Sequence, residues 1–297
     1  MMTRPQITFV VPTRNRSGQL LETLSRLRPS AGRLSHEIIV VDRAGSDGTA
    51  EAVAKRFPHV RLIELSADHE AAARNLGLSA AAADYVFMLD DGTWPQEGTA
   101  EFALRMMAQQ PQLAAAVCRL RRPGESSRHE ANGPAGLFAA SGVVLRRRAV
   151  IEVGGYPIDA SGFAEQYDLC ARLWQAGWQV RHFEPMLAWR MPDVDGRDAD
   201  TVLRILTATA LRFWSRYAPQ NHCRAMLDAT IEQYRRVAED ASAVAGYREG
   251  LAVGLAAARR NRTRRRPLTD EQLAELFGPA GPPARRHEVP AGVPTAA

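Results

Sequence analysis

The sequence lacks any long hydrophobic run and has few cysteines. No stretch of the 297 residues approaches the ~18 continuous apolar residues that a membrane-spanning helix needs. The apolar run before Pro12 is too short for the core of a signal peptide, so we expect a cytoplasmic protein. The three cysteines (Cys118, Cys170 and Cys223) form no CxxC pair. This spacing argues against a zinc site or a disulfide framework and predicts buried free thiols.

Lysine is also almost absent, and the positive charge is concentrated in one segment. Lys55 is the only lysine, and residues 259–297 contain eight arginines against four acids. Most of the net charge of +5 therefore lies in this segment, and the remaining residues are nearly neutral. A nucleic-acid-binding protein more typically spreads its basic residues over a folded face. We therefore expect no nucleic-acid partner.

What the sequence does contain is the composition of a globular chain, with 45% hydrophobic and 24% charged residues. Short apolar runs alternate with segments of helical periodicity through the first two hundred residues. We predict strands at 7–11, 37–41, 61–65 and 85–89, and helices at 17–27, 47–56 and 69–82. This alternation predicts an α/β fold with a mostly parallel sheet flanked by helices.

The second half of the chain is predicted to be mainly helical. We expect a long loop at 119–136, further strands at 143–145 and 180–183, a helix at 163–176 and continuous helical structure from 200 to 262. The predicted organisation is a catalytic domain at 1–199, a C-terminal helical region at 200–266 and a largely disordered Pro/Ala-rich tail at 267–297.

Polar side chains follow three of the predicted strands. They are Thr13 and Asn15 after the first strand, Asp42 after the second, and Asp90 and Asp91 after the fourth. Parallel sheets bind ligands outside the carboxyl ends of their strands. We therefore expect these side chains to form one site.

The adjacent carboxylates Asp90 and Asp91 are the sharpest local signal. Two neighbouring carboxylates repel each other, and a cation or partial protonation relieves the repulsion. A divalent ion that also binds a phosphate would use such a pair. The alternative is that Asp90 caps the turn at Gly92 while Asp91 is only solvated.

The predicted helix at 163–176 carries a second group of charges. Glu165, Asp168 and Arg172 are spaced three and four residues apart, so they share one face. A carboxylate on this face is a candidate general base. The alternative is a surface ion pair between Asp168 and Arg172.

Taken in order, these segments resemble the inverting family 2 glycosyltransferases with the Rossmann-like GT-A fold. The resemblance covers about the first 190 residues. It rests on Val-Val-Pro-Thr-Arg-Asn (10–15), Glu-Ile-Ile-Val-Val-Asp (37–42), Ala-Arg-Asn-Leu-Gly (73–77), Leu-Asp-Asp-Gly-Thr (89–93), Gly-Gly-Tyr (154–156) and the helix from 165 to 177.

The resemblance implies a role for each residue. Pro12, Thr13, Asn15, Asp42, Arg74 and Asp90 would bind the nucleotide, and Asp91 would hold Mg²⁺ or Mn²⁺. The implied activity is transfer of a sugar from a UDP-, dTDP- or GDP-linked donor to an acceptor hydroxyl with inversion. The acceptor would be a glycan or a lipid-linked glycan in bacterial surface-polysaccharide or secondary-metabolite synthesis.

Two positions depart from the family pattern. Gly92 stands where the family usually has an acid tied to the metal, and Gln166 stands where it usually has the catalytic aspartate. Glutamine cannot accept a proton at neutral pH, so the base would be Glu165 or Asp168, of which we favour Glu165. These departures also admit another hypothesis, a catalytically weakened relative that binds a nucleotide or glycan without turnover.

The C-terminal helices have two interpretations. An apolar face would either pack on the catalytic domain or touch a membrane that carries a lipid-linked acceptor; its residues are Leu203, Leu206, Leu211, Phe213 and Trp214. The arginines at 259–266 would strengthen attraction to an anionic leaflet, or would form a solvated helix end. The expected location therefore includes peripheral contact with the inner face of the membrane.

A nucleotidyltransferase on a similar sheet is a rival from another class. It would carry a glycine- and lysine-rich phosphate loop after the first strand, where this chain has Pro-Thr-Arg-Asn-Arg-Ser-Gly (12–18).

Overall fold

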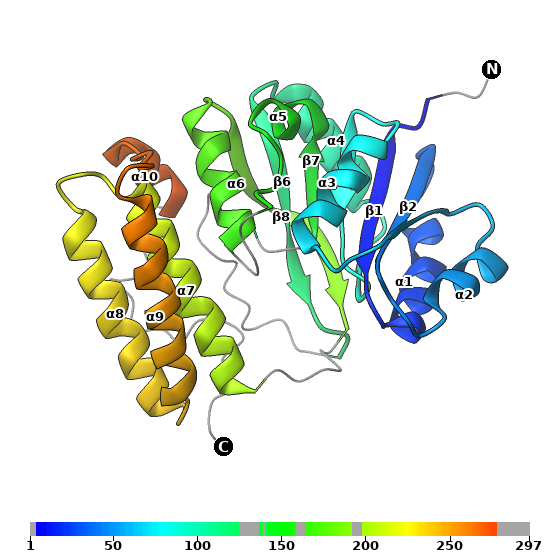
Figure 1. The fold of residues 1–297 in the computed structure, drawn as a ribbon. Helices are drawn as coiled ribbons and strands as arrows, with labels where there is room; N and C mark the ends of the chain where they lie inside the picture. The colour runs from blue at the N-terminus through cyan, green and yellow to red at the C-terminus, as the bar shows by residue number, and fades with distance from the viewer. Residues whose placement is uncertain (1–3, 125–136, 139–140, 159–163, 192–197, 278–297) are drawn as a thin grey trace. The chain divides into compact units, whose positions relative to one another are not determined.

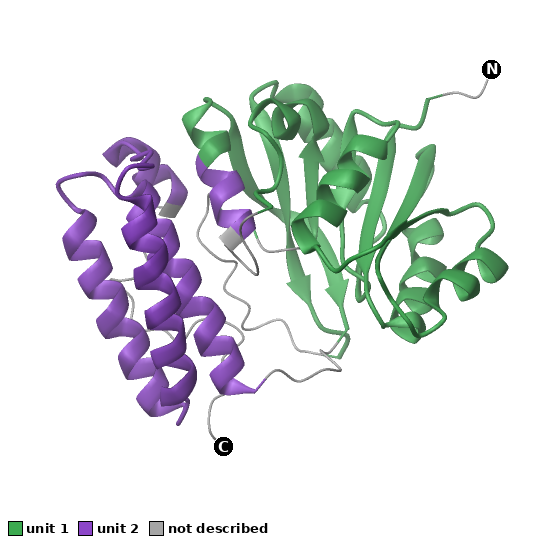
Figure 2. Ribbon diagram, viewed as in Figure 1, with its two compact units in different colours: residues 1–161, 172–192 green, residues 162–171, 193–297 purple. Residues whose placement is uncertain are grey.

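The computed structural model describes residues 4–124, 137–138, 141–158, 164–191 and 198–277, which fall into two compact units (Figure 1). One unit comprises residues 1–161 and 172–192, and the other comprises residues 162–171 and 193–297 (Figure 2). We call them the sheet unit and the helical unit. The loop predicted at 119–136 is strand as far as Arg121, and from residue 125 it lies outside the described residues.

The described strands of the sheet unit form one eight-stranded sheet in the order β3-β2-β1-β4-β7-β6-β8-β5. The strands are β1 (Ile7–Thr13), β2 (His36–Arg43), β3 (Arg61–Leu65), β4 (Tyr85–Met88), β5 (Thr93–Pro95), β6 (Leu113–Arg121), β7 (Val143–Arg146) and β8 (Gln179–Arg190). Strands β1 to β4 pair in parallel, as predicted. Strand β7 is antiparallel to both of its neighbours, and β5 is antiparallel to β8.

Helices cover both faces of this sheet. They are α1 (Ser17–Ser30), α2 (Thr49–Arg56), α3 (Glu70–Ala80), α4 (Thr99–Gln109) and α5 (Arg147–Glu152), followed by the last residues of α6 (Ala164–Gln175). All seven residues of β1 are buried, because alternate side chains point to opposite faces. Phe9 packs in a core shared with α1 and α4. Val10 points the other way, towards Gly77 of α3.

A short connection forces the sheet to curl. Only residues 89–92 link β4 to β5, although β7, β6 and β8 lie between these strands in the sheet order. In a flat sheet the two strands would lie about 19 Å apart, which is more than a turn of this length spans. An irregularity in the β6–β8 register, where Val117 pairs with His182 but Arg119 pairs with Leu187, lets β8 bend. The end of β8 is thereby brought to the residues that follow β4.

The helical unit contains α7 (Ala199–Tyr217), α8 (Cys223–Asp240), α9 (Val244–Asn261) and α10 (Asp270–Phe277), together with the first part of α6. Helices α7, α8 and α9 lie side by side (Figure 1). Glycines 246, 250 and 254 of α9 face α7, and a Cβ at Gly246 would lie 1.9 Å from the carbonyl oxygen of Asp200. Only glycine permits so close an approach of the two backbones.

The structure corrects two predictions about the C-terminal region. The proposed membrane face is buried within the protein: Leu203, Leu206, Leu211, Phe213 and Trp214 are at most 9% exposed. Leu203 and Leu206 form a core with residues of α8 and α9. In addition, residues 270–277, which were predicted to belong to a disordered tail, form α10; residues 278–297 lie outside the described residues.

The prediction of buried free thiols is confirmed for two of the three cysteines. Cys118 and Cys170 are buried free thiols, and Cys223 is partly buried. In the described part of the chain, no helix is both long enough and apolar enough to cross a membrane.

Candidate functional site

The acidic turn, residues 90–92, directly follows β4 and is the centre of the candidate site. Asp91 is 5% exposed, and its two carboxylate oxygens have different partners. The Thr13 hydroxyl donates to Oδ2 at 3.0 Å, and Nη1 of Arg16 lies 3.3 Å from Oδ1. The Thr23 hydroxyl donates to the Asp91 carbonyl oxygen at 2.8 Å. The turn is therefore fixed by the end of β1 and by α1.

Burial makes the ionised form of Asp91 costly. The pKa of Asp91 is raised to about 6 as the net result of several causes: burial is the largest, the Asp90 carboxylate adds to it, and Arg16 and the Thr13 hydroxyl oppose both. Arg16 was not among the residues selected from the sequence. Its position just beyond the carboxyl end of β1 could have identified it as a site residue, because cations there face the acids that follow β4.

The curled end of β8 closes the other side of the acidic turn. The Met191 amide donates to the Gly92 carbonyl oxygen at 2.8 Å. Nη2 of Arg190 lies 3.9 Å from Oδ2 of Asp90. The second oxygen of Asp90, Oδ1, accepts a hydrogen bond from the Gly92 amide at 3.2 Å. Asp90 therefore caps its own turn, as the alternative interpretation expected, but Asp91 is buried and not merely solvated.

Asp42 lies beside Thr13 at the same edge of the sheet. The two residues are partners in the parallel pairing of β1 with β2. Asp42 is 3% exposed, and its Oδ1 accepts a hydrogen bond from the Gly45 amide at 3.0 Å. Burial raises the pKa of Asp42, and the Gly45 amide opposes this shift. A Cβ at Gly45 would lie 2.7 Å from Oδ1 of Asp42, so a glycine is required for this contact.

The loops after β1 and β2 are joined through two further candidates. Asn15 has a φ of +52°, a conformation that asparagine tolerates better than most residues. Its Oδ1 accepts a hydrogen bond from the Ser46 amide at 2.7 Å. Pro12 is buried opposite Val41 in the same pairing. The structure therefore brings Pro12, Thr13 and Asn15 together with the acids after β2 and β4.

Arg74 belongs to a different set of contacts. It is 3% exposed on α3, and its Nη2 donates to Glu70 at 2.8 Å. Its guanidinium lies 5.7 Å from the centre of the Tyr156 ring. The Asn75 side chain holds this tyrosine by accepting from its amide and donating to its carbonyl oxygen, both at 2.8 Å. Asn75 and Tyr156 thus support Arg74, a role that the sequence alone did not identify.

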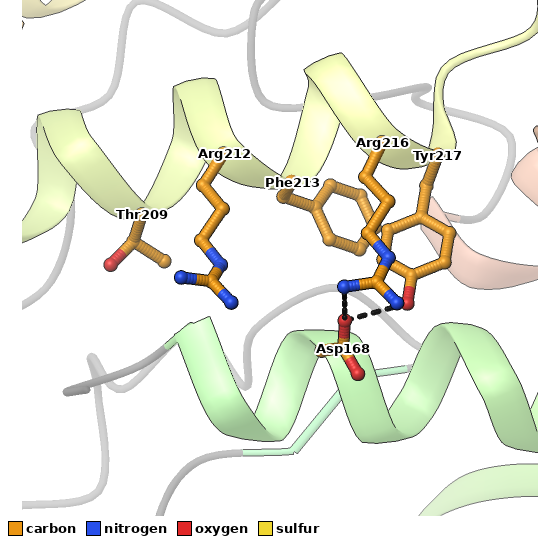
Figure 3. Close-up of a pocket in the computed structure, with 6 residues that line it drawn as sticks. All are labelled: Asp168, Thr209, Arg212, Phe213, Arg216 and Tyr217. Carbon is orange, nitrogen blue, oxygen red and sulfur yellow. Dashed lines mark hydrogen bonds and ion pairs between the residues drawn. The ribbon is translucent and has the colours of Figure 1, made fainter. Parts of the chain in front are cut away.

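The two candidate bases lie in the part of α6 that belongs to the helical unit. Glu165 is fully buried, and Nε2 of Gln166 donates to its Oε1 at 3.0 Å. Asp168 is 4% exposed. The alternative interpretation of a surface ion pair with Arg172 is therefore wrong in placing Asp168 at the surface. The Tyr217 hydroxyl donates to Oδ2 of Asp168 at 2.6 Å (Figure 3).

Whether these residues suit a divalent cation depends on the available donors. The described residues contain no group of three or more His, Cys, Asp or Glu side chains that could hold a metal. A carboxylate at position 92 is missing, and a Cβ there would lie 2.2 Å from Nε2 of Gln19. Asp90 and Asp91 remain as two adjacent carboxylates. This set suits an ion whose other ligands are substrate phosphates, which is the usual arrangement for Mg²⁺.

The curled mixed sheet, with acids after β2 and β4, is the sheet of the GT-A fold. Two solved structures share it. A mannosyltransferase from Pyrobaculum calidifontis, in complex with GDP-Man and Mn²⁺, has a TM-score of 0.58 and 20% identity and covers 88% of each chain. Residues 1–349 of TarS of S. aureus, in complex with UDP-GlcNAc, have a TM-score of 0.59 and 13% identity, and the match covers 88% of this chain and 84% of that TarS chain.

Sequence comparison points to the same class of protein. Residues 8–154, just under half of the chain, match the glycosyl transferase family 2 model. The pre-mycofactocin glycosyltransferase of Mycobacterium tuberculosis is 29% identical over 203 residues, which is 61% of this chain and 41% of that protein. The succinoglycan biosynthesis protein ExoA of Rhizobium meliloti is 27% identical over 203 residues, which is 60% of this chain and 61% of ExoA. The chain therefore spans less than two thirds of the length of either relative.

Proposed function

We propose that the protein transfers a sugar from a nucleoside diphosphate sugar to an acceptor hydroxyl, with inversion at the anomeric carbon. The observation that carries this proposal is the cluster of Thr13, Asp42 and Asp91 at one edge of a GT-A sheet. The solved relatives that bind GDP-Man and UDP-GlcNAc support a nucleotide-sugar donor. The similarity to a pre-mycofactocin glycosyltransferase and to the succinoglycan biosynthesis protein ExoA supports a bacterial surface-polysaccharide or secondary-metabolite acceptor.

In this proposal each residue has a defined role. The Asp42 carboxylate accepts a hydrogen bond from an N–H group of the nucleotide base, while Pro12, Thr13 and Asn15 line the same edge. Arg74 faces the diphosphate. Asp90 contacts the ribose and, with Asp91, would hold a Mg²⁺ or Mn²⁺ ion, which would offset the negative charge of the diphosphate.

The proposed reaction is a single displacement. The Glu165 carboxylate takes the proton of the acceptor hydroxyl as its oxygen bonds to the anomeric carbon. The bond between that carbon and the phosphate oxygen breaks, and the nucleoside diphosphate leaves with the electron pair. We prefer Glu165 to Asp168 as the base because the Asp168 carboxylate accepts a short hydrogen bond from Tyr217 and lies 3.4 Å from Nη1 of Arg216.

The experiment is a panel of donors. UDP, dTDP and GDP are first tested for thermal stabilisation with and without Mn²⁺, because a ligand that binds only the folded state raises its apparent stability. The sugar-linked form of the nucleotide that binds is then tested for release of nucleoside diphosphate. Asp42→Ala is expected to abolish the stabilisation.

A second candidate function is binding without turnover. Gly92 and Gln166, where the family usually has acids, favour it. A nucleotide that stabilises the protein while no sugar-linked donor is cleaved, with or without Mn²⁺, would establish the binding function and refute the transferase.

We also propose that the protein lies at the cytoplasmic face of an anionic membrane, through the end of α9. Val253 is 54% and Leu255 is 38% exposed on this helix, and exposed arginines follow at 259, 260, 262 and 264. Each basic residue near an anionic surface contributes about 1 kcal/mol. Co-sedimentation with anionic but not with neutral vesicles, lost at high salt, is the expected result. Equal recovery with both kinds of vesicle would refute the contact.

A further inference from the structure

The division of α6 raises the question of which part of the protein positions the candidate base. Helix α6 begins at Ala164, and its residues up to 171 belong to the helical unit, together with α7 to α10 (Figure 2). Glu165 lies in this segment. Tyr167 and Asp168, in the same segment, contact side chains of α7 within this unit.

Asp168, one turn after Glu165, makes a short and buried polar contact. Tyr217, at the end of α7, donates its hydroxyl to Oδ2 of Asp168 at 2.6 Å, and Nη1 of Arg216 lies 3.4 Å from the same oxygen. Figure 3 shows both side chains reaching from α7 towards Asp168. Asp168 is 4% exposed and Tyr217 is 1% exposed. A buried carboxylate is costly without such partners, so this contact strongly favours one position of the helix.

Aromatic side chains fix the same segment from another direction. The rings of Tyr167 and Phe213 meet edge to face with centroids 5.9 Å apart. Phe213 in turn contacts Trp214 at 5.0 Å and Tyr217 at 5.2 Å between ring centroids. Tyr167 and Asp168 are consecutive residues. Their contacts therefore fix both the rotation of this part of α6 about its axis and its position along that axis relative to α7.

Because a helix is rigid over one turn, fixing the position of Asp168 also restricts the position of Glu165, one turn earlier. Residues three apart lie on nearly the same face, about 4.5 Å apart along the axis, because each residue rises ~1.5 Å. Fixing Asp168 therefore fixes the direction in which the backbone presents Glu165. Misplacing a catalytic group by about 1 Å is enough to lower a rate by about a hundredfold.

We propose that Tyr217 and Arg216 are positioning residues, which act through Asp168 to hold Glu165 in its working position. The C-terminal helices are then part of the catalytic machinery and not an appendage to a catalytic domain that ends at residue 199. This inference rests on the proposed transferase function. It adds to that function two residues of α7, neither of which is required to touch the substrate.

The test is Tyr217→Phe in the full-length chain, which removes one hydroxyl and leaves the ring in place. Nucleoside diphosphate release from the donor found in the panel is measured with water as acceptor, since water also needs a base. We expect kcat to fall by about ten- to a hundredfold while KM for the donor changes by less than about twofold. Because a smaller amount of folded enzyme would also lower the apparent kcat at an unchanged KM, kcat is expressed per nucleotide-binding site, counted by titration with the donor nucleotide; a merely structural role would then leave kcat unchanged.

Tyr247→Phe is the matched control. The Tyr247 hydroxyl donates to the Ile231 carbonyl oxygen at 3.3 Å, in the same unit but on α9. Its loss is expected to leave kcat and KM unchanged. An equal fall in kcat for both variants, or a kcat for Tyr217→Phe within about twofold of the unmodified protein, would overturn the proposal.

Amide hydrogen exchange separates this inference from the proposed function. Tyr217→Phe is expected to speed exchange in residues 164–171 and not in β1 to β4, whereas Tyr247→Phe leaves 164–171 unchanged. If the unmodified protein cleaves no donor, the transferase function fails whatever the exchange shows. If it cleaves a donor and exchange at 164–171 is the same in both variants, the positioning role alone is refuted.

Discussion

Replacing Asp91 by asparagine is expected to stabilise the ligand-free protein while removing its function. The Asp91 carboxyl is buried, and its pKa is raised from 3.8 to about 6. The folded chain therefore binds more protons than the unfolded chain between about pH 4 and pH 6. Stability is lost as the pH rises through this window. A shift of this size corresponds to ~3 kcal/mol at pH 7, since one pKa unit is about 1.4 kcal/mol.

Asp91→Asn removes this cost because asparagine is neutral at every pH and can still accept from the Thr13 hydroxyl. The gain is reduced by the loss of the partner of Arg16, whose side chain is 27% exposed and can be partly hydrated. We therefore expect the free energy of unfolding to rise by about 1 to 3 kcal/mol at pH 7, by about half as much at pH 5 and by little at pH 4.

Calorimetry with EDTA at these three pH values measures the effect. Each kcal/mol is worth roughly 2 to 4 °C in Tm for a unit of this size. Asp84→Asn is the control, because Asp84 is 68% exposed and its replacement is expected to change stability by less than about 0.5 kcal/mol. An Asp91→Asn variant that is less stable than the unmodified protein at pH 7, or equally shifted at all three pH values, would refute the burial argument. Stabilisation by the donor nucleotide with Mn²⁺ is expected to disappear in this variant.

Three further substitutions test other parts of the structure. Gly77→Ala places a Cβ 2.3 Å from Cγ1 of Val10, so we expect a loss of ~1 to 3 kcal/mol in chemical denaturation. Gly45→Ala pushes the Asp42 carboxylate away and is expected to weaken nucleotide binding by about tenfold in titration calorimetry, since a contact to a charged group contributes ~1.5 kcal/mol. Glu165→Gln is expected to keep donor affinity and lower nucleoside diphosphate release by about a hundredfold or more.

Gly18→Ala is the control for the first two substitutions, because a Cβ there meets no atom within 4 Å. It is expected to be neutral or slightly stabilising in a helix. Unchanged stability of Gly77→Ala would contradict the close packing of α3 on β1. Nucleotide affinity that survives in Gly45→Ala would remove Asp42 from the proposed role, and full activity of Glu165→Gln would exclude Glu165 as the base.

The first four strands were predictable because their signal is local. Strands β1, β2 and β4 are short, largely buried apolar runs with polar residues at or just after their ends, so the sequence also located Asp42 and Asp91; β3 is a short run with no buried residue. Strand β5 was not predictable. Its three residues, Thr93–Pro95, follow an apparent turn, and their pairing partners lie about a hundred positions later in β8.

The side chains that surround Asp90 and Asp91 also could not be predicted from the sequence. The Arg16 contact with Asp91 depends on the conformation of the loop after β1, and the Arg190 approach to Asp90 depends on the bend in β8. Asp168 was judged from its spacing to Arg172, four residues away. Its contact with Tyr217 spans 49 positions of sequence, and helical periodicity carries no information about such a pair.

The bend in β8 has a consequence for the order in which the protein is made. The acidic turn is complete only when the Met191 amide reaches the Gly92 carbonyl oxygen. On the ribosome, β1 to β4 emerge long before β8, so the nascent chain holds both aspartates but lacks one wall of the turn. In the proposed function the donor nucleotide binds the finished turn, so it would bind only chains elongated past residue 191 and not shorter products of premature termination.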